Sequence, residues 1–238
     1  MYLSVIIPAY NEEKRIAKTL LAVDGFLRRQ NYEYEILVVS DGSKDKTPEV
    51  IYGLKEQIKN LRFVDEKINH GKGWAVRRGM LEAHGQIRLF MDADNSTSVD
   101  QITKFLPYFD EGYDVVIGSR RMKESVIAVR QPWTREFLGW AFRLLVHIIV
   151  PLGVTDSQAG FKAFSARAVQ IIFPKQKIFR WAFDVELLAI ARKAKLKIKE
   201  IPIVWINDAE SHVKPLGMIK MLFEVLQVNW NLWNGNYA

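Results

Sequence analysis

The first half of the chain alternates short apolar runs with longer segments whose apolar residues recur at helical spacing. The short runs are rich in valine, isoleucine and leucine and carry few charges, as do strands that are buried on both faces of a sheet. They predict strands at residues 3–9, 35–40, 62–65, 87–91 and 115–118. The longer segments predict helices at about residues 12–29, capped by Asn11, and at 48–59, 73–83 and 99–109.

Buried strands that alternate with helices predict an α/β fold, with a mostly parallel sheet covered by helices on both faces. The pattern changes after Gly118. There we expect a basic loop at 119–134, a helix from Arg135, a short strand within 155–164, a helix at 184–195, a strand at 198–205 and an apolar-faced helix at 216–233. No repeat or linker divides the chain, which indicates a single domain spanning residues 1–238.

The apolar stretches are too short or too interrupted to predict a membrane span. Residues 137–154 come nearest to the ~18 uninterrupted apolar residues required, but Arg143, His147 and Pro151 break the run. This segment is either a core helix or a helix that lies in a membrane interface, and Trp140, together with the tryptophans near the C-terminus, suits the second alternative. The N-terminal residues show no signal-peptide pattern, so we expect a cytoplasmic protein, peripheral on the membrane.

The composition is that of a globular domain, since 49% of the 238 residues are hydrophobic and 26% are charged. Cysteine is absent, which excludes disulfides, thiolate metal sites and a cysteine nucleophile. The formal net charge is +7, and it is unevenly distributed. Residues 120–200 hold sixteen basic and six acidic residues, whereas the rest of the chain holds 18 basic and 21 acidic ones. A basic back half favours an anionic partner, such as a nucleic acid, a membrane headgroup or a phosphorylated small molecule.

Asp92 and Asp94 directly follow the predicted strand at 87–91. Two carboxylates separated by one residue can both face a crevice and hold a hard divalent cation, Mg²⁺ or Mn²⁺, that would bridge a diphosphate. A solvated turn would have the same residues. The position after a buried strand favours the metal site, because ligands bind beyond the carboxyl ends of parallel strands.

Other polar residues of the first half also lie at predicted element ends. Tyr10 offers a ring that could stack on a base, Glu12 a carboxylate, and Asp41 an acceptor for a base N–H. A capped helix start and an Asx-turn explain the same residues structurally. Lys72 precedes a predicted helix, where a cation near the helix N-terminus suits phosphate.

In the second half, residues 156–162 combine a carboxylate, an amide, a glycine and a cation. Asp184 stands where a helix is predicted to begin, and we expect it to cap that helix. The four histidines show neither metal-binding spacing nor a Ser/His/Asp pattern.

Taken in order, these motifs resemble those of inverting glycosyltransferases of family two, which have a GT-A fold. The resemblance rests on SVIIPAYNEE, VVSDGSKDKT, NHGKGWAVRRGM, LFMDADNST, GSR and DSQAGFKAF, which together span most of the chain. Within that family, the back half (DSQAGFK, RWAFDVELL and the VW at 204–205) is most similar to dolichyl-phosphate β-glucosyltransferases. Dolichol-phosphate mannose synthases share the front motifs and residues 156–162 more loosely.

The resemblance implies transfer of a hexose from a nucleotide sugar, preferably glucose from UDP-glucose, to a polyprenyl phosphate, with inversion and with Mg²⁺ or Mn²⁺ as cofactor. It makes residues 1–118 the nucleotide-sugar-binding half and residues 119–238 the acceptor-binding half. It also implies a membrane-surface partner and no nucleic acid.

Roles for individual residues follow from the same resemblance. The nucleoside would be held by Pro8, Tyr10, Glu12 and Asp41, with Lys72 nearby. Ribose, metal and diphosphate would be bound by Asp92 and Asp94, and the acceptor phosphate by Arg120 and Arg135. The site would be closed around the sugar and diphosphate by Asp156, Gln158 and Lys162. The expected catalytic residues are Asp94, Asp156 and Asp184.

Two positions depart from the family pattern. Ser40 stands where the family usually has a first aspartate before Asp41, and Asn95 stands where the glucosyltransferases usually have glycine. With Ser40, one carboxylate fewer is available to recognise the base, which leaves open the alternative that the protein binds a nucleotide without catalysing transfer. The second departure leaves the donor sugar open.

The acceptor decides whether a base is needed. A phosphate is already anionic and needs placement by arginines, whereas a hydroxyl needs a carboxylate base, for which Asp184 is the candidate. Alternatives are therefore the same fold with a saccharide or other hydroxyl acceptor, and a mannose synthase that uses GDP-mannose. A nucleic-acid-binding protein is disfavoured, because the basic residues form no known reader motif.

Overall fold

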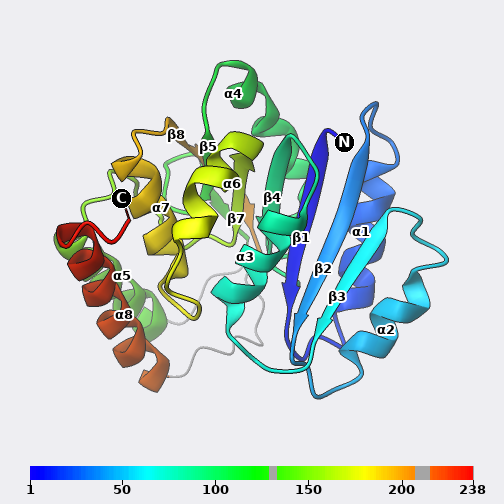
Figure 1. Cartoon of the computed structure of the whole chain (residues 1–238), viewed down its shortest axis with the longest axis horizontal. Coiled ribbons are helices and arrows are strands. Elements are labelled where there is room, and N and C mark those ends of the chain that lie inside the picture. Colours follow the sequence, from blue (N-terminus) through cyan, green and yellow to red (C-terminus); the bar gives the residue numbers. More distant parts are fainter. Residues whose placement is uncertain (129–132, 207–214, 238) are drawn as a thin grey trace.

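The computed structural model describes residues 1–128, 133–206 and 215–237. Its centre is a seven-stranded sheet in the order β3-β2-β1-β4-β7-β5-β8, with every strand parallel to its neighbours except β7 (Figure 1). The strands are β1 (Leu3–Ala9), β2 (Tyr34–Asp41), β3 (Leu61–Glu66), β4 (Ile87–Met91), β5 (Val115–Ser119), β7 (Phe161–Ser165) and β8 (Ile198–Pro202). The antiparallel β7 lies between β4 and β5, so it separates the two parallel parts of the sheet.

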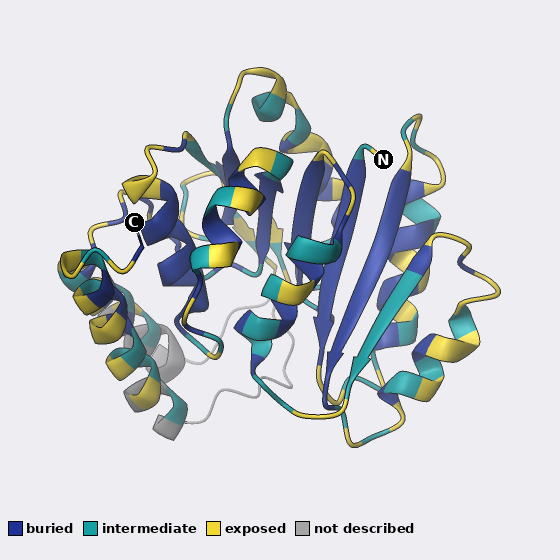
Figure 2. Cartoon of the chain, viewed as in Figure 1, coloured by how far each residue is buried: buried dark blue, intermediate teal, exposed yellow. Residues whose placement is uncertain are grey.

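Helices cover both faces of this sheet, which confirms the predicted α/β class. One apolar layer joins the sheet to α1 (Ile16–Leu27), α2 (Thr47–Leu54), the 3₁₀ helix η1 (Val99–Lys104) and α4 (Leu106–Asp110). The other joins it to α3 (Lys72–Glu82), α5 (Trp133–Ile149), α6 (Ala166–Ile172), η2 (Phe173–Lys175), α7 (Phe183–Lys193) and α8 (Pro215–Trp233). The central strands are buried throughout (Figure 2).

Alternation along the strands explains the two layers. In β1, Val5 and Ile7 belong to the layer with α1, whereas Ile6 between them belongs to the layer with α3. Because successive side chains of a strand point to opposite faces, a strand that is apolar at every position buries both of its faces. The strand predictions for the first half were accurate for this reason, and the one at 87–91 coincides with β4. The strand expected within 155–164 is β7, which begins only at Phe161.

The prediction that Asn11 caps the first helix was wrong. Helix α1 begins at Ile16, and Asn11 lies before it with φ of 56°, in the left-handed region. Its side-chain oxygen accepts the N–H of Lys44 at 2.8 Å, and its own N–H donates to the hydroxyl of Ser43 at 3.1 Å. Asn11 therefore ties the end of β1 to the loop after β2, because tertiary partners satisfy its side chain better than the adjacent helix does.

Several element boundaries also differ from the predictions. The helix predicted at 48–59 ends at Leu54, and the one predicted at 99–109 divides into η1 and α4, where a proline stands in the first turn of α4. The segment at 198–205 divides after Pro202, and β9 (Val204–Trp205) pairs instead with β6 (Val126–Ile127). Neither β6 nor the short α6 was predicted. Within the part of the chain that the structure describes, no helix has the length and apolarity to cross a membrane.

Candidate functional site

Most of the residues singled out in the sequence come together at the carboxyl ends of the parallel strands. Asp92 and Asp94 follow β4, Arg120 follows β5, and Lys72 and Asp184 lie in the first turns of α3 and α7. These charged groups are close enough to interact electrostatically, and Asp156 and Lys162 belong to the same group. The fold therefore assembles four carboxylates and three cations at one edge of the sheet.

The turn after β4 is fixed from two sides. The carbonyl of Ala93 accepts the hydroxyl of Thr19 in α1 at 2.7 Å, and the Oδ1 of Asp94 accepts the N–H of Ser96 at 2.9 Å. Asn95 has φ of 55°, a conformation that glycine adopts freely and that asparagine tolerates better than most residues. Its departure from the glycine of the family motif therefore preserves the shape of the turn.

Two neighbours define the position of the Asp92 carboxylate: the ammonium of Lys72 and the backbone of Gly160. The Nζ of Lys72 lies 2.5 Å from its Oδ1. A Cβ at Gly160 would lie 2.0 Å from its Oδ2, so only glycine leaves room for the carboxylate there. Although burial opposes it, the negative charge of Asp92 raises the pKa of Lys72, which stays a cation.

Asp94 makes no ion pair with any residue in the described ranges. Burial and the neighbouring charge of Asp92 raise its pKa. A divalent cation between the two carboxylates would relieve this repulsion. The described residues include no cluster of three or more metal-ligating side chains, but Mg²⁺ commonly binds through one or two carboxylates, with water and substrate phosphates completing its shell. Asp92 and Asp94 therefore fit such an ion.

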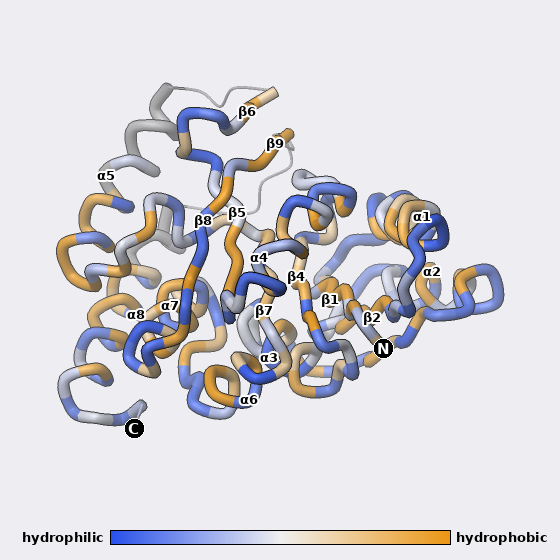
Figure 3. The backbone as a smooth tube through the Cα atoms, turned by 90° about the horizontal axis from the view of Figure 1, so that it is seen from above, coloured by the Kyte–Doolittle hydropathy of each residue, from blue (hydrophilic) through white to orange (hydrophobic). Residues whose placement is uncertain are grey.

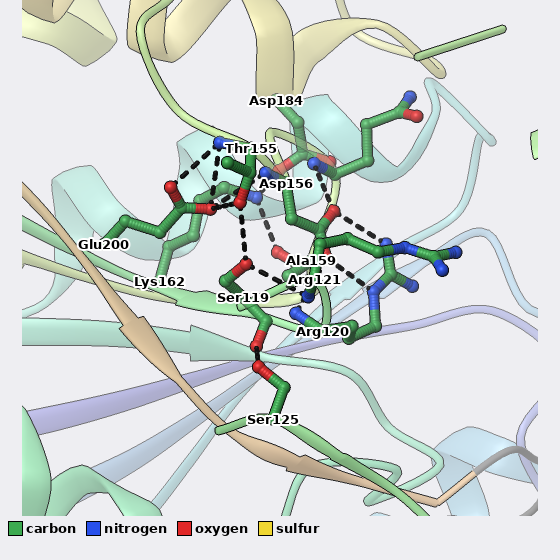
Figure 4. A network of polar contacts seen from close by, with 11 residues as sticks. Ser119, Arg120, Arg121, Ser125, Thr155, Asp156, Ala159, Lys162, Asp184 and Glu200 are labelled. Atoms are coloured by element: carbon green, nitrogen blue, oxygen red, sulfur yellow. Dashed lines mark hydrogen bonds and ion pairs between the residues drawn. The ribbon is translucent and has the colours of Figure 1, made fainter. Parts of the chain in front are cut away.

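Arg120 and Asp156 form a two-pronged ion pair beside this turn (Figure 4). The guanidinium donates through Nε at 2.7 Å and Nη2 at 2.9 Å, and the backbone N–H of Arg120 donates at 3.0 Å. Asp156 is completely buried, and although burial opposes it, Arg120 holds the pKa of the Asp156 carboxyl well below its usual range. The indole of Trp205 stacks at 5.4 Å from the Arg120 Cζ. Arg120 is thus oriented on two sides.

Glu200 of β8 binds the backbone next to this ion pair. It was not identified as a site residue from the sequence. Its carboxylate accepts the backbone N–H groups of Thr155 and Asp156, and the hydroxyl of Thr155 at 2.7 Å. Ser119 joins the network through the Thr155 hydroxyl at 3.2 Å (Figure 4). Glu200 therefore fixes the backbone that presents Asp156.

Lys162 and Asp184 form a buried ion pair within the core. The Nζ of Lys162 lies 2.5 Å from the Oδ1 of Asp184 and donates to the carbonyl of Ala159 at 2.5 Å. Burial lowers the pKa of Lys162 and raises that of Asp184, because a charge of either sign is unfavourable there without its partner. The prediction that Asp184 caps its helix was wrong: the cap position is Ala182, and the Asp184 carboxylate is bound to Lys162 of β7 instead.

Asp41 is bound to the loop before α3. Its Oδ2 accepts the N–H of Gly71 at 2.7 Å and the side-chain amide of Asn69 at 3.0 Å, and its Oδ1 accepts the N–H of His70 at 2.8 Å. The partners lie about thirty positions away in the chain, so the Asx-turn reading was wrong. Asp41 holds the loop that leads to Lys72, and its buried neighbour Ser40 contacts Ser43 at 3.0 Å.

The remaining predicted residues lie at the end of β1, in the turn that follows it and in the loop before β7, and one of them has a side chain that the structure does not describe. Pro8 is buried in β1, and Tyr10 beyond it is 42% exposed. Glu12 is ion-paired with Arg15 at 2.7 Å. The amide of Gln158 contacts the sulfur of Met221 in α8 at 3.6 Å. The side chain of Arg135 lies outside the described residues, although its backbone belongs to α5.

Comparison with known proteins agrees with this picture. The model of the family "Glycosyl transferase family 2" matches residues 4–172. A dolichyl-phosphate β-glucosyltransferase of Trichomonas vaginalis is 37% identical over 98% of this chain and 76% of its own length. The human dolichyl-phosphate β-glucosyltransferase is 34% identical over 90% of this chain and 70% of its own.

Among solved structures, the glucosyl-3-phosphoglycerate synthase of Mycobacterium tuberculosis superimposes with a TM-score of 0.65 at 19% identity. The match covers 97% of this chain and 79% of that one. That synthase was crystallised with Mn²⁺, UDP and glucosyl-3-phosphoglycerate. At this level of identity the likeness shows the GT-A fold alone.

The buried ion pair yields a prediction for stability. Lys162→Met should lower the free energy of unfolding by about 3–5 kcal/mol, because it leaves the Asp184 carboxylate buried without a partner. The double variant Lys162→Met with Asp184→Leu should recover most of that loss, since it removes both charges. Urea unfolding followed by tryptophan fluorescence measures both. A double variant no more stable than Lys162→Met would contradict the account.

Proposed function

Because the chain belongs to glycosyltransferase family 2, we propose that it transfers glucose from UDP-glucose to a dolichyl or related polyprenyl phosphate. The observation that carries this proposal is its similarity to dolichyl-phosphate β-glucosyltransferases, which extends over 90–98% of the chain in the two relatives compared. In the reaction, an oxygen of the acceptor phosphate attacks the anomeric carbon of glucose. The bond from that carbon to the diphosphate breaks, and its electron pair leaves with UDP, so that the configuration is inverted.

The nucleoside is bound at the ends of β1 and β2 in this proposal. The exposed ring of Tyr10 is available to stack on the base, and Pro8 and Glu12 flank it. Both oxygens of Asp41 already accept hydrogen bonds from the loop at 69–71. We therefore assign Asp41 a positioning role: it holds the glycine-rich loop against which the nucleotide would lie.

The diphosphate is bound between the turn after β4 and the start of α3. Asp92 and Asp94 would hold Mg²⁺ or Mn²⁺, which neutralises the charge that develops on the diphosphate leaving group. Lys72 adds a positive charge at the N-terminus of α3, where the helix dipole also favours an anion. The chain itself thus contributes a cation and a helix end to the leaving group.

The burial of the carboxylates supports a phosphate acceptor over a hydroxyl acceptor. A base must reach the proton that it removes, yet Asp184 is 6% exposed and bound to Lys162, and Asp156 is completely buried against Arg120. A phosphate needs no base. It needs cations, and Arg120 is oriented at the site edge, with Arg135 proposed as a second contact. In this role Asp156 and Lys162 position the site, and Gln158 lines it.

A pair of neighbouring helices offers a surface for the membrane in which such an acceptor lies. Helix α5 packs against α8. Both helices carry exposed residues (Figure 2) and apolar residues (Figure 3), and several residues of each helix are both. The exposed residues are Trp140, Leu144, Leu145 and Ile148 on α5 and Phe223, Leu226, Trp230 and Trp233 on α8. We call these eight residues the α5–α8 apolar face. Tryptophan favours the interface between lipid and water, so this face suits peripheral binding to the cytoplasmic leaflet.

Activity tests the function directly. With UDP-glucose, dolichyl phosphate and Mn²⁺, the wild-type chain should form a glucosylated lipid, and chelation of the metal should abolish it. Asp94→Asn should lower kcat by on the order of 100-fold, because it removes one of the two negative charges of the proposed metal site. Asp100→Asn, on the exposed surface of η1, is the matched control and should retain full activity.

Parallel reactions with GDP-mannose and with alcohol acceptors separate the alternatives. Transfer only from GDP-mannose would replace glucose by mannose in the proposal. Transfer only to an alcohol would overturn the phosphate acceptor, and in that case Asp184→Asn should abolish turnover.

Vesicle binding tests the α5–α8 apolar face. The double variant Trp230→Glu with Trp233→Glu should bind phosphatidylcholine–phosphatidylglycerol vesicles roughly tenfold or more weakly than the wild type, because two large apolar side chains no longer enter the lipid. Leu21→Glu, an exposed apolar position on α1 in the other helical layer, should bind normally. Equal sedimentation of all three proteins with vesicles would exclude this face as the membrane contact.

A further inference from the structure

Helix α7 begins without a cap of its own. Its cap position is Ala182, whose side chain can accept no hydrogen bond, and the first N–H groups of a helix have no partners within it. The N–H of this cap residue is bound by another helix: the Oε2 of Glu224 in α8 accepts the N–H of Ala182 at 2.8 Å and that of Trp181, the residue before it, at 2.9 Å. A carboxylate from α8 thus holds the backbone where α7 begins.

Residues 177–182, the segment that Glu224 holds, are connected to the site through α7 and through α3. The segment leads into the first turn of α7, where Asp184 is bound to Lys162. Before that, the carbonyl of Phe179 accepts the N–H of Trp74 in α3 at 3.2 Å. A Cβ at Gly71 would lie 2.4 Å from the same carbonyl, so the segment packs tightly on the loop that presents Lys72.

A second carboxylate holds the other end of this segment. Glu186 is completely buried and accepts the N–H groups of Lys177 and Ile178 at 2.8–3.1 Å. Its Oε1 also accepts the hydroxyl of Tyr237 at 2.7 Å, which fixes the end of the described chain to α7. Two carboxylates therefore bind the backbone of residues 177–182: Glu186 of α7 at its start and Glu224 of α8 at its end.

Helix α8 faces both the segment and the solvent. Its inner side carries Glu224 and the buried Val225 and Val228, while Phe223 and Trp230 on its outer side are 67% and 68% exposed. Met221, one turn before Glu224 and Val225, contacts Gln158, which the proposed function places at the site. The helix that carries half of the α5–α8 apolar face is thus also the helix that touches two loops of the site.

We propose that Glu224 is a positioning residue that couples the seating of α8 on a lipid surface to the geometry of the α7 N-terminus, and thereby to the sugar site. The proposal rests on the proposed function for the identity of the lipid surface. When Phe223, Trp230 and Trp233 enter lipid, α8 is held in the orientation in which Glu224 reaches the N–H groups of Trp181 and Ala182. Lipid thus favours the state in which Asp184 and Lys72 are in place.

Hydrogen exchange of the full chain tests the coupling without requiring activity. Phosphatidylcholine–phosphatidylglycerol vesicles that contain no dolichyl phosphate should slow exchange at the amides of Trp181 and Ala182 several-fold in the wild type. In Glu224→Leu these amides should exchange fast with and without vesicles, although the variant still binds the vesicles. Gln227→Leu, an exposed position on the same helix, is the matched control and should behave as the wild type.

Kinetics with a short, water-soluble polyprenyl phosphate supply the second readout. The same vesicles should raise kcat of the wild type several-fold, and Glu224→Gln, which retains an acceptor oxygen, should keep part of that stimulation, whereas Glu224→Leu should lose it. The KM for UDP-glucose should change less than kcat in either variant, because the proposed function places the nucleoside at β1 and β2, away from α7, and only the diphosphate meets Lys72. A merely structural role for Glu224 would lower stability without altering the response to vesicles.

The two proposals fail in different ways. Absence of any transfer to phosphate lipids would overturn the proposed function, while vesicle-induced protection of Trp181 and Ala182 would still support the coupling. Exchange at these amides that is unaffected by bound vesicles in the wild type, or equally protected in Glu224→Leu, would overturn the coupling.

Discussion

Charges of both signs are buried together at the carboxyl edge of the sheet, and the site depends on that pairing. Neither Lys162 nor Asp184 is stable alone in an apolar core, because each would lose its hydration without compensation. Their contact joins β7 to the first turn of α7. Strand β7 lies between β4, which leads to Asp92, and β5, which leads to Arg120. The ion pair of Lys162 with Asp184 therefore lies next to both strands that carry the site. The geometry of the site therefore depends on the ion pair between Lys162 and Asp184.

The charges at this edge do not cancel. Lys72, Arg120 and Lys162 each bind one of the carboxylates, and Asp94 is left without a cation among the described residues. A diphosphate would be repelled by that remaining charge unless a metal ion came with it. An overall net charge of +7 conceals this local acidity, because the basic residues are concentrated in the back half, on the acceptor side of the proposed reaction.

Local pattern predicted the strands and most helices, because apolar runs and helical spacing reflect burial that neighbouring residues share. The end of β4 and its two aspartates follow from the sequence for this reason. Predictions that depended on a distant partner were wrong: Asn11 binds the loop after β2 and Asp184 binds Lys162, and no local pattern indicates either. Glu200 and Glu224 were missed for a related reason, since a carboxylate that accepts backbone N–H groups from another element leaves no motif of its own.

Titration calorimetry of UDP with and without Mn²⁺ tests most directly the claim that the site carries an excess of carboxylates that a metal ion completes. The account predicts one UDP bound per chain in the presence of Mn²⁺ and binding at least about tenfold weaker in excess chelator, where the repulsion from Asp92 and Asp94 is unrelieved. UDP that binds as tightly in chelator as in Mn²⁺ would contradict it.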